Sequence, residues 1–117
     1  MPVGAFLSAG IDSSSIVAAM AAASDRPVRT YTITFPPADR AGERTLDDPK
    51  VAAATAQHFG CDHHEIVIEP RVADILPRLV WHMDEPVADP AIIGAYFVAR
   101  EARGSATVLL SGLGGDE

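Results

Sequence analysis

The sequence predicts an α/β protein in which helices cover the faces of a parallel sheet. Strand-like segments, which are apolar or alternate between apolar and polar residues, alternate along the chain with segments of helical pattern. Two of the strand-like segments run directly into turns of small residues, and ligands bind beyond the carboxyl ends of strands in such sheets. The 117 residues form one small domain without an internal repeat.

The first element is a strand that leads through a tight turn into a helix. Val3 to Leu7 is a short apolar run typical of a buried strand, and the residues at positions 8–10 are all small. Ile16, Val17 and Met20 then have the spacing of one helix face. The order strand, small-residue turn, helix is therefore expected at the start of the chain.

A second strand and a second helix follow. Tyr31, Ile33 and Phe35 alternate with threonines, which predicts a strand with two chemically different faces. Residues 36–48 are rich in Pro, Gly and charge and are expected to be a connection. Residues 51–59 are rich in alanine and are followed by a glycine, which indicates a helix with a C-terminal stop.

The rest of the chain supplies two strands and two helices. Glu65 to Ile68 is expected to be the third strand, and Glu69-Pro70 should end it. Helices are predicted over Ala73 to Met83 and over Ala91 to Arg103, and Ala106 to Leu110 is expected to be the fourth strand. Because this strand also runs into a glycine-rich turn, the two turns should face one site.

The turn after the first strand has the composition of a phosphate-binding loop. Small side chains at positions 8–10 let backbone N–H groups approach an anion, and the following helix directs its own unpaired N–H groups there. Asp12 repels a bare phosphate but suits a magnesium ion that bridges carboxylate and phosphate. A nucleotide with magnesium therefore fits best. The alternative is an ordinary turn in which Asp12 or Ser13 caps the helix. Neither the Walker loop nor the dinucleotide fingerprint is present.

Charge and composition exclude several classes of partner. The formal net charge is −7, so the basic face that nucleic acid or an anionic membrane requires is not expected. Cys61, the single cysteine, cannot form an internal disulfide, and neither a signal peptide nor a run of membrane-spanning length is visible. We expect a soluble cytoplasmic protein.

A cluster of potential zinc ligands offers a second interpretation of the middle of the chain. His58, Cys61, His63 and His64 lie within seven positions, and His82 could add a further ligand. Zinc sites usually show a more regular spacing. The aromatic neighbour of His82, Trp81, is expected to lie in the core or in a domain contact.

Three segments carry a resemblance to a known family. Residues 8–14, Ser-Ala-Gly-Ile-Asp-Ser-Ser, resemble the pyrophosphate loop of N-type ATP pyrophosphatases, Ser-Gly-Gly-x-Asp-Ser-Ser. Residues 111–117, Ser-Gly-Leu-Gly-Gly-Asp-Glu, resemble a signature of the asparagine synthetases, Ser-Gly-Asp/Glu-Gly-Gly/Ser-Asp-Glu. Residues 84–86, Asp-Glu-Pro, and residues 62–65, Asp-His-His-Glu, also have counterparts there. The chain is therefore identified as a partial member of the glutamine-hydrolysing asparagine synthetase family, in its ATP-pyrophosphatase (synthetase) domain.

The resemblance implies a three-layer αβα fold with a twisted, Rossmann-like parallel sheet of the N-type ATP pyrophosphatase type. Residues 1–117 would form one partial ATP-binding domain, without the family's N-terminal glutaminase domain and C-terminal helical part. A separate glutaminase or C-terminal subunit would then be a partner, and apolar surface should be open for it. The chain's single lysine, Lys50, does not match the family's catalytic lysine.

The implied chemistry is ATP-dependent adenylation of a carboxylate, such as that of aspartate, followed by amide formation. No catalytic residue is assigned. The residues implied in binding ATP are Leu7, Ser8, Gly10, Asp12, Ser13, Ser14, Ile33, Ser111 and Gly112, and those implied as magnesium ligands are Asp12 and Asp84. Within this set, Leu7 and Ile33 match positions at the adenosine end of ATP. Asp116 is a further candidate, or a cap on a following helix.

Two positions depart from the family pattern. Leu113 stands where the family carries Asp or Glu and cannot accept a proton, and Ala9 replaces a glycine, which matters if the backbone there needs a positive φ. Two alternatives therefore stay open beside amide formation from aspartate. One is a nucleotide-binding or regulatory module without turnover, and the other is a ligase of the same fold that closes a β-lactam or macrolactam ring.

Overall fold

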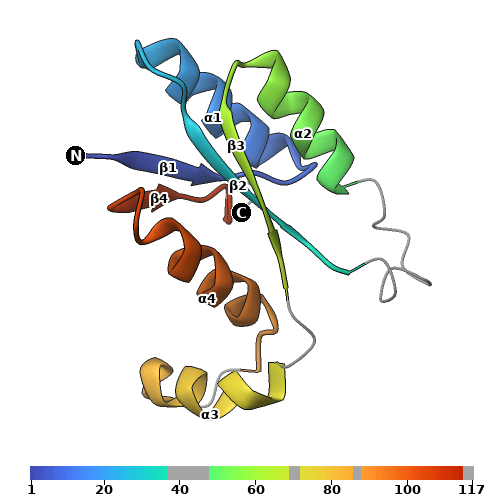
Figure 1. Ribbon diagram of the computed structural model, residues 1–117, viewed down its shortest axis with the longest axis vertical. Coiled ribbons are helices and arrows are strands. Elements are labelled where there is room, and N and C mark those ends of the chain that lie inside the picture. Colours follow the sequence, from blue (N-terminus) through green and yellow to red (C-terminus); the bar gives the residue numbers. More distant parts are fainter. Residues whose placement is uncertain (37–47, 69–71, 86–87, 115–117) are drawn as a thin grey trace.

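The computed structural model describes residues 1–36, 48–68, 72–85 and 88–114 and contains one parallel four-stranded sheet (Figure 1). The strand order is β3-β2-β1-β4. The strands are β1 (Val3–Phe6), β2 (Arg29–Thr34), β3 (Asp62–Val67) and β4 (Val108–Leu110). The helices are α1 (Ile11–Ala23), α2 (Asp48–His58), α3 (Val72–Met83) and α4 (Ala91–Ala102). The predicted α/β class and the parallel sheet are confirmed.

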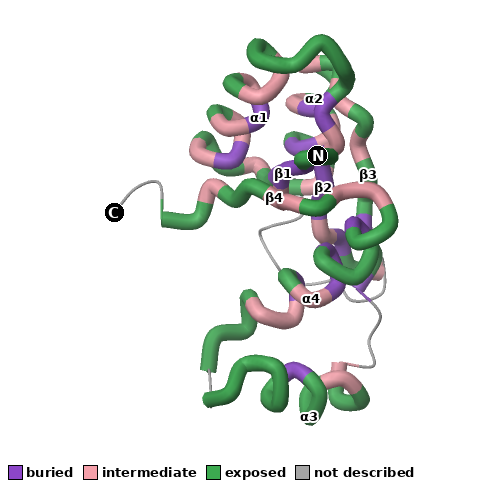
Figure 2. The backbone as a smooth tube through the Cα atoms, turned by 90° about the vertical axis from the view of Figure 1, so that its left-hand side faces the viewer, coloured by how far each residue is buried: buried purple, intermediate pink, exposed green. Residues whose placement is uncertain are grey.

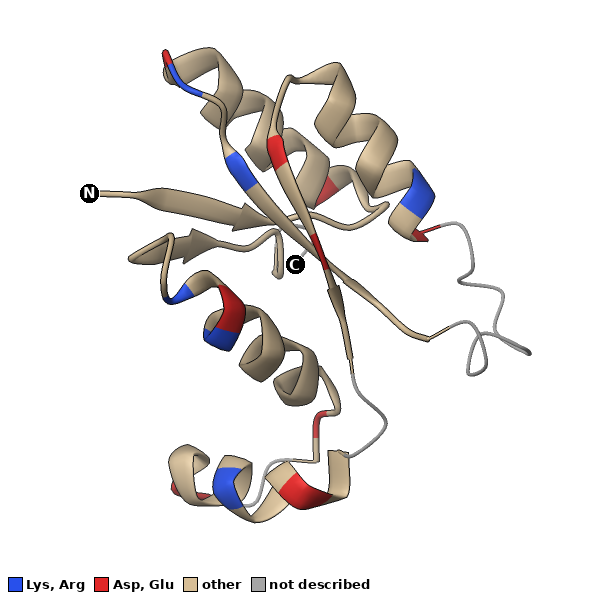
Figure 3. Ribbon diagram, in the orientation of Figure 1, with Lys and Arg blue, Asp and Glu red and all other residues tan. Residues whose placement is uncertain are grey.

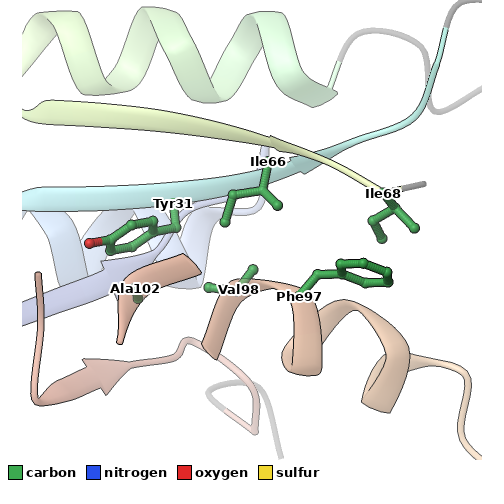
Figure 4. Packing of buried hydrophobic residues seen from close by; sticks show 6 residues of the cluster. All are labelled: Tyr31, Ile66, Ile68, Phe97, Val98 and Ala102. Atoms are coloured by element: carbon green, nitrogen blue, oxygen red, sulfur yellow. The ribbon is translucent and has the colours of Figure 1, made fainter. Parts of the chain in front are cut away.

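Two hydrophobic cores, one on each face of the sheet, make the fold three-layered. Helices α1 and α2 lie together on one face, where small residues let them approach the strands closely (Figure 1). That core consists of Ala5, Leu7, Val17, Ala52 and Ala56. Helix α4 covers the opposite face over a core of larger side chains (Figure 4). It consists of Tyr31, Ile66, Ile68, Phe97, Val98 and Ala102.

Strand β2 has the two different faces that its alternation predicts. Tyr31 faces α4 and is 2% exposed, whereas Thr30 and Thr32 point to the opposite face and are also buried. Their hydroxyls are satisfied, because Thr30 Oγ1 bonds His63 Nδ1 at 2.9 Å and Thr32 Oγ1 donates to the Leu7 carbonyl at 2.6 Å. The threonine face is therefore buried without orphaned hydroxyls.

Helix α3 lies outside the three layers. In Figure 1, α4 separates it from the sheet, and Figure 2 shows it exposed along most of its length. Its contacts are mainly with α4. Trp81 on α3 is 75% exposed, so the expectation of a core position for it is wrong and only the domain contact stays open. None of the helices in the described ranges is long and apolar enough to cross a membrane.

Most element boundaries agree with the prediction within two residues, and two do not. Helix α2 begins at Asp48 rather than at residue 51, because Pro49 is well placed in a first helical turn, where its missing N–H costs nothing. Asp48 therefore belongs to the helix and not to the connection. Strand β3 begins at Asp62 rather than at residue 65, since it pairs with β2 from Arg29 onward. The predicted connection over residues 37–47 and the break at residues 69–70 lie outside the described residues.

The order of the strands reverses beside β1. The chain passes from β1 through α1 to β2 on one side, whereas β4 pairs with β1 on the other. Such a switch point, at the carboxyl ends of the strands, is where ligands bind in open α/β sheets. The turns after β1 and β4 both lie there.

Candidate functional site

The two predicted turns meet at one pocket of about 250 Å³. Its lining comes from the first turns of α1 and from the turn after β4, and comprises Asp12, Ser15, Ile16, Ser111, Gly112, Leu113 and Gly114. The expectation that both motifs face one site therefore holds for Asp12 and for the turn after β4, whereas residues 8–10 are not part of the lining. Ser15 and Ile16 were missed at the level of sequence, although Ser15 lies three residues after Asp12 and thus on the same helix face.

Gly112 allows the two turns to touch. A Cβ at this position would lie 2.6 Å from the Ser13 nitrogen and 2.9 Å from the Asp12 carbonyl carbon. Both of these are backbone atoms, which cannot yield as the tip of a side chain can. Only glycine therefore permits the turn after β4 to approach the first turn of α1 this closely.

The first turn of α1 leaves its N–H groups without a side-chain cap. Gly10 is the N-cap residue, with φ −72° and ψ 150°, and no side chain caps the helix. The Ser14 N–H donates to the Gly10 carbonyl at 3.2 Å, so the N–H groups of Ile11 to Ser13 precede this first helical bond. The alternative in which Asp12 or Ser13 is the cap is therefore wrong, because both lie inside the helix.

Serine side chains fix the shape of the turn that precedes α1. The Ser8 N–H donates to Ser13 Oγ at 3.2 Å, the two hydroxyl oxygens are 2.9 Å apart, and the Gly10 N–H donates to Ser8 Oγ at 3.1 Å. Within the described residues, the only non-glycine with a positive φ is Asp84. The backbone at Ala9 therefore does not need glycine, and its replacement of the family glycine carries no backbone strain.

The other predicted ATP-binding residues do not all reach the pocket. Ser111 and Gly112 line it. Leu7 is 3% exposed and packs in the core under α1 and α2. Ile33 faces α4, where a Cβ on Gly94 would meet its Cδ1 at 2.5 Å. The structure thus places the side chains of Leu7 and Ile33 in the two cores, outside the pocket lining. Four further predicted residues, Ser8, Gly10, Ser13 and Ser14, are also not part of this lining.

Of the two predicted magnesium ligands, only Asp12 lines the pocket. Asp84 directly follows α3, with φ 59°, and α3 lies beyond α4 from the sheet (Figure 1). No group of three or more His, Cys, Asp or Glu side chains in the described part of the chain could hold a metal ion by itself. A single carboxylate still suits magnesium, which is commonly bound by one or two carboxylates together with substrate phosphates. Asp116 lies outside the described residues.

The zinc alternative finds no support in these residues. His63 and His64 are adjacent on β3 and therefore point to opposite faces of the sheet. His63 bonds Thr30 on one face, whereas His64 stacks on Tyr31 and contacts Asp62 Oδ1 at 3.2 Å. In addition, burial raises the pKa of the Cys61 thiol, which opposes the thiolate that zinc requires.

The surroundings of His63 favour the uncharged form of its ring. Burial lowers the pKa of His63, the charge of Glu65 opposes this shift, and His64 adds to it. The His63 Nε2 atom is buried and has no hydrogen-bond partner among the residues that the structure describes. The neutral ring, with one nitrogen bonded to Thr30, is therefore a structural part of the sheet face under α2.

Comparison with known proteins identifies relatives along the whole chain. A family model described as asparagine synthase matches residues 1–117. A candidate asparagine synthetase (glutamine-hydrolyzing) of Mycobacterium tuberculosis (strain ATCC 25618 / H37Rv) is 46% identical over 116 residues, which are 98% of this chain and 17% of that protein. Asparagine synthetase (glutamine-hydrolyzing) 1 of Bacillus subtilis (strain 168) is 44% identical over 118 residues, covering 100% of this chain and 18% of its own length.

A solved structure shares the fold at low sequence identity. It is that of a predicted subunit of tRNA methyltransferase from Methanocaldococcus jannaschii, with a TM-score of 0.55 and 17% identity. The match covers 100% of this chain and 55% of that one. This likeness supports the predicted α/β fold with a parallel sheet, and no more than the fold. The present chain spans less than a fifth of the length of the two relatives named above.

Proposed function

This chain belongs to the asparagine synthase family, and from that premise we propose that it binds ATP at the turn between β1 and α1 and serves in ATP-dependent amide formation. The observation that carries the proposal is the contact at Gly112, which brings the turn after β4 against the first turn of α1. Residues from both turns then line one pocket at the switch point of the sheet.

The phosphates of ATP would lie against the start of α1. The N–H groups of Ile11 to Ser13 and the positive end of the helix dipole attract an anion there. The chain as a whole carries a net charge of −7 and repels ATP at long range, so local donors have to supply the affinity. In this proposal the pyrophosphate part contacts Ser8, Gly10, Asp12, Ser13 and Ser14.

The remaining contacts follow from the same orientation. Ser111 and Gly112 would contact the nucleotide from the turn after β4. The adenosine end would lie at the carboxyl ends of β1 and β2, next to Leu7 and Ile33. Since the side chains of these two residues are packed in the cores, their part would be to shape the surface beneath the adenosine.

Asp12 is the residue that we propose to hold magnesium. The ion, when bound, would offset the charge that develops on the departing pyrophosphate. Asp12 lies in the lining of the pocket and can offer a carboxylate oxygen to the side of the phosphates that faces α1. Asp84 would join as a second ligand only if the segment after α3 approached this turn.

The proposed reaction has two steps that conserve atoms and charge. A carboxylate oxygen of the substrate attacks the α-phosphorus of ATP, the bond to the bridging oxygen of the β-phosphate breaks, and pyrophosphate leaves. An amine nitrogen then attacks the acyl carbon of the adenylate, AMP leaves with the electrons of the C–O bond, and the nitrogen loses a proton. With aspartate and ammonia the product is asparagine.

Leu113 gives a reason to keep binding and turnover apart. It is 88% exposed at the pocket and stands where the resemblance places an acidic residue. A leucine cannot relay the proton that the amine must lose. Nucleotide binding without turnover by this chain, or turnover that depends on residues from elsewhere, is the second candidate function.

The first experiment is a calorimetric titration of the chain with ATP and magnesium. We expect binding by the parent chain and a loss of at least tenfold in affinity for Asp12→Ala, which is about 1.4 kcal/mol. The matched control is Asp25→Ala, an exposed carboxylate after the end of α1, which should bind as the parent does. If the folded parent chain does not bind ATP, the proposed site is wrong.

Pyrophosphate release separates the possible reactions. Release on addition of aspartate and ammonia would support asparagine formation. ATP binding without any release would support the non-catalytic alternative. Release only with a different carboxylate, such as a β-amino acid or a peptide, would support a ring-closing ligase.

A further inference from the structure

Helix α3 carries apolar side chains around most of its circumference, but the rest of the molecule covers only one side of it. Leu79 is 5% exposed and faces the rest of the molecule, whereas Leu76, Val80 and Trp81 are 41%, 52% and 75% exposed. A helix that is apolar around most of its circumference is normally buried on more than one side. The outer side of α3 therefore has the character of an interface.

A groove lies between α3 and α4, and of the three exposed apolar residues of α3 named above only Trp81 lines it. Its volume is about 1220 Å³, which exceeds the roughly 300–1000 Å³ of sites for small ligands. Most of its lining is apolar or aromatic, and on α4 the lining residues Ile92, Ala95 and Ala99 follow helical spacing. It shares no lining residue with the pocket at Asp12. Two adjacent helices with an apolar groove between them offer the geometry that receives a third helix.

The charged side chains and the histidine that line the groove are all basic. They are Arg78 and His82 on α3, Arg100 on α4, and Arg103 just after it. Figure 3 shows basic and acidic residues on both helices, and the acidic ones, Asp74 and Glu101, do not line the groove. Among the described residues, no carboxylate forms an ion pair with any of these three guanidinium groups.

One of the arginines is held in place by aromatic rings. The Arg100 Cζ lies 4.9 Å from the centroid of the Phe97 ring and 5.9 Å from that of Tyr96. A guanidinium over an aromatic face is stabilised there and keeps its N–H donors at the edge of the group. Arg100 can therefore donate hydrogen bonds to a carboxylate and lose less side-chain conformational entropy than a mobile arginine would.

We propose that the groove between α3 and α4 binds an acidic amphipathic helix of a partner protein. The apolar stripe of that helix would cover Trp81 and Met83, and carboxylates beside the stripe would pair with Arg78, Arg100 and Arg103. A second copy of this chain that docked groove to groove would not fit, because the arginines of the two copies would face and repel one another. A nucleic acid would not either, because it would leave the apolar lining uncovered and would be repelled by the acidic chain.

Trp81 supplies the readout, since it is the only tryptophan of the chain. The probe is a synthetic helical peptide of about 18 residues, with leucine along one stripe and glutamate on both flanks. A second peptide with lysine in place of glutamate is the control. We expect the acidic peptide to shift the Trp81 emission to shorter wavelength with saturation, and to bind at least about tenfold more tightly than the lysine peptide.

Charge reversal tests the role of the arginines. The double variant Arg78→Glu with Arg103→Glu should lose the shift with the acidic peptide and gain one with the lysine peptide. The control Arg26→Glu, an exposed arginine in the turn after α1, should behave as the parent chain does. Circular dichroism shows whether each variant is folded, and the comparison of the two peptides on the parent chain needs no variant.

Four results would overturn the proposal. The first is equal binding of the two peptides by the parent chain, and the second is no emission shift with either. The third is a Trp81 emission shift that depends on protein concentration alone, with dimers in sedimentation, which would assign the groove to a second copy. The fourth is an equal shift with a single-stranded oligonucleotide, which would assign it to polyanions.

Discussion

Gly112 shows what a single residue contributes to the candidate site. Its place in the signature resembling that of asparagine synthetases was visible in the sequence, but the reason for a glycine was not. That reason is a contact with the backbone at Asp12 and Ser13, about a hundred residues away in the chain. Such a long-range contact cannot be predicted from local pattern. For the same reason, the sequence could not show that Asp84 lies beyond α4.

Replacement of Gly112 by alanine should separate the two turns. The added methyl group would overlap the Ser13 nitrogen, so we expect a loss of about 1–3 kcal/mol in the free energy of unfolding and a weaker affinity for ATP with magnesium. Gly104→Ala is the matched control, because nothing lies within 4 Å of its Cβ position. Chemical denaturation and calorimetry measure the two effects. Equal behaviour of the two variants would contradict the role assigned to Gly112.

At the level of elements, periodicity predicted the type of every helix and strand, and failed mainly where an element begins. Strand β3 opens with Asp62, His63 and His64, which are polar and conceal the strand pattern. They belong to the sheet because they pair with β2 in register. Helix α2 begins at Asp48 because Pro49 suits a first helical turn, a signal that was present in the sequence.

A hydrogen bond ties β2 to the turn between α4 and β4. The hydroxyls of Tyr31 and Ser105 bond each other, and the Arg29 side chain donates to the Ser105 carbonyl at 2.6 Å. Tyr31 is 2% exposed, so its hydroxyl has little access to water as a substitute partner. This bond therefore helps to set the position from which β4 starts.

The two single variants that remove this bond should together lose more free energy of unfolding than the double variant loses. We expect Ser105→Ala to lower the free energy of unfolding by about 1–3 kcal/mol, because the buried Tyr31 hydroxyl loses its partner. Tyr31→Phe should cost less, since Ser105 Oγ keeps its bond to the Ala102 carbonyl. The double variant should lose less than the sum of the single ones. Urea denaturation measures all three, and simple additivity would show that the bond does not couple these elements.

For the molecule as a whole, the layered fold and the position of the site followed from the sequence, whereas the exposed groove did not. Alternating strands and helices predicted a covered parallel sheet, and the two glycine turns predicted a common site at its edge. The groove depends on how α3 packs against α4, which no local pattern encodes. Trp81 is therefore exposed, although its residue type alone favoured the core.

Global unfolding should depend on pH through His63. Its pKa in the folded chain lies below the 6.5 of an ordinary histidine because of burial, so the unfolded chain takes up the proton first. The stabilisation is then complete above about pH 6.5 and decreases as the pH falls below it. We expect His63→Gln to reduce this decrease between about pH 7.5 and about pH 5.5 in urea denaturation. His58→Gln, at an exposed position, should keep the full decrease, and an unchanged profile for His63→Gln would refute the assignment.

The pairing of β1 with β4 has a consequence for how this chain folds. Val3 lies opposite Val108, so the strands that carry the two turns are far apart in the sequence. Closing so long a loop is entropically costly, and contacts of high sequence separation are formed slowly. A nucleotide that contacts both turns would then hold β1 and β4 together across this separation. Its binding would slow the unfolding of the terminal strands most of all, and hydrogen exchange at β1 and β4 would register it.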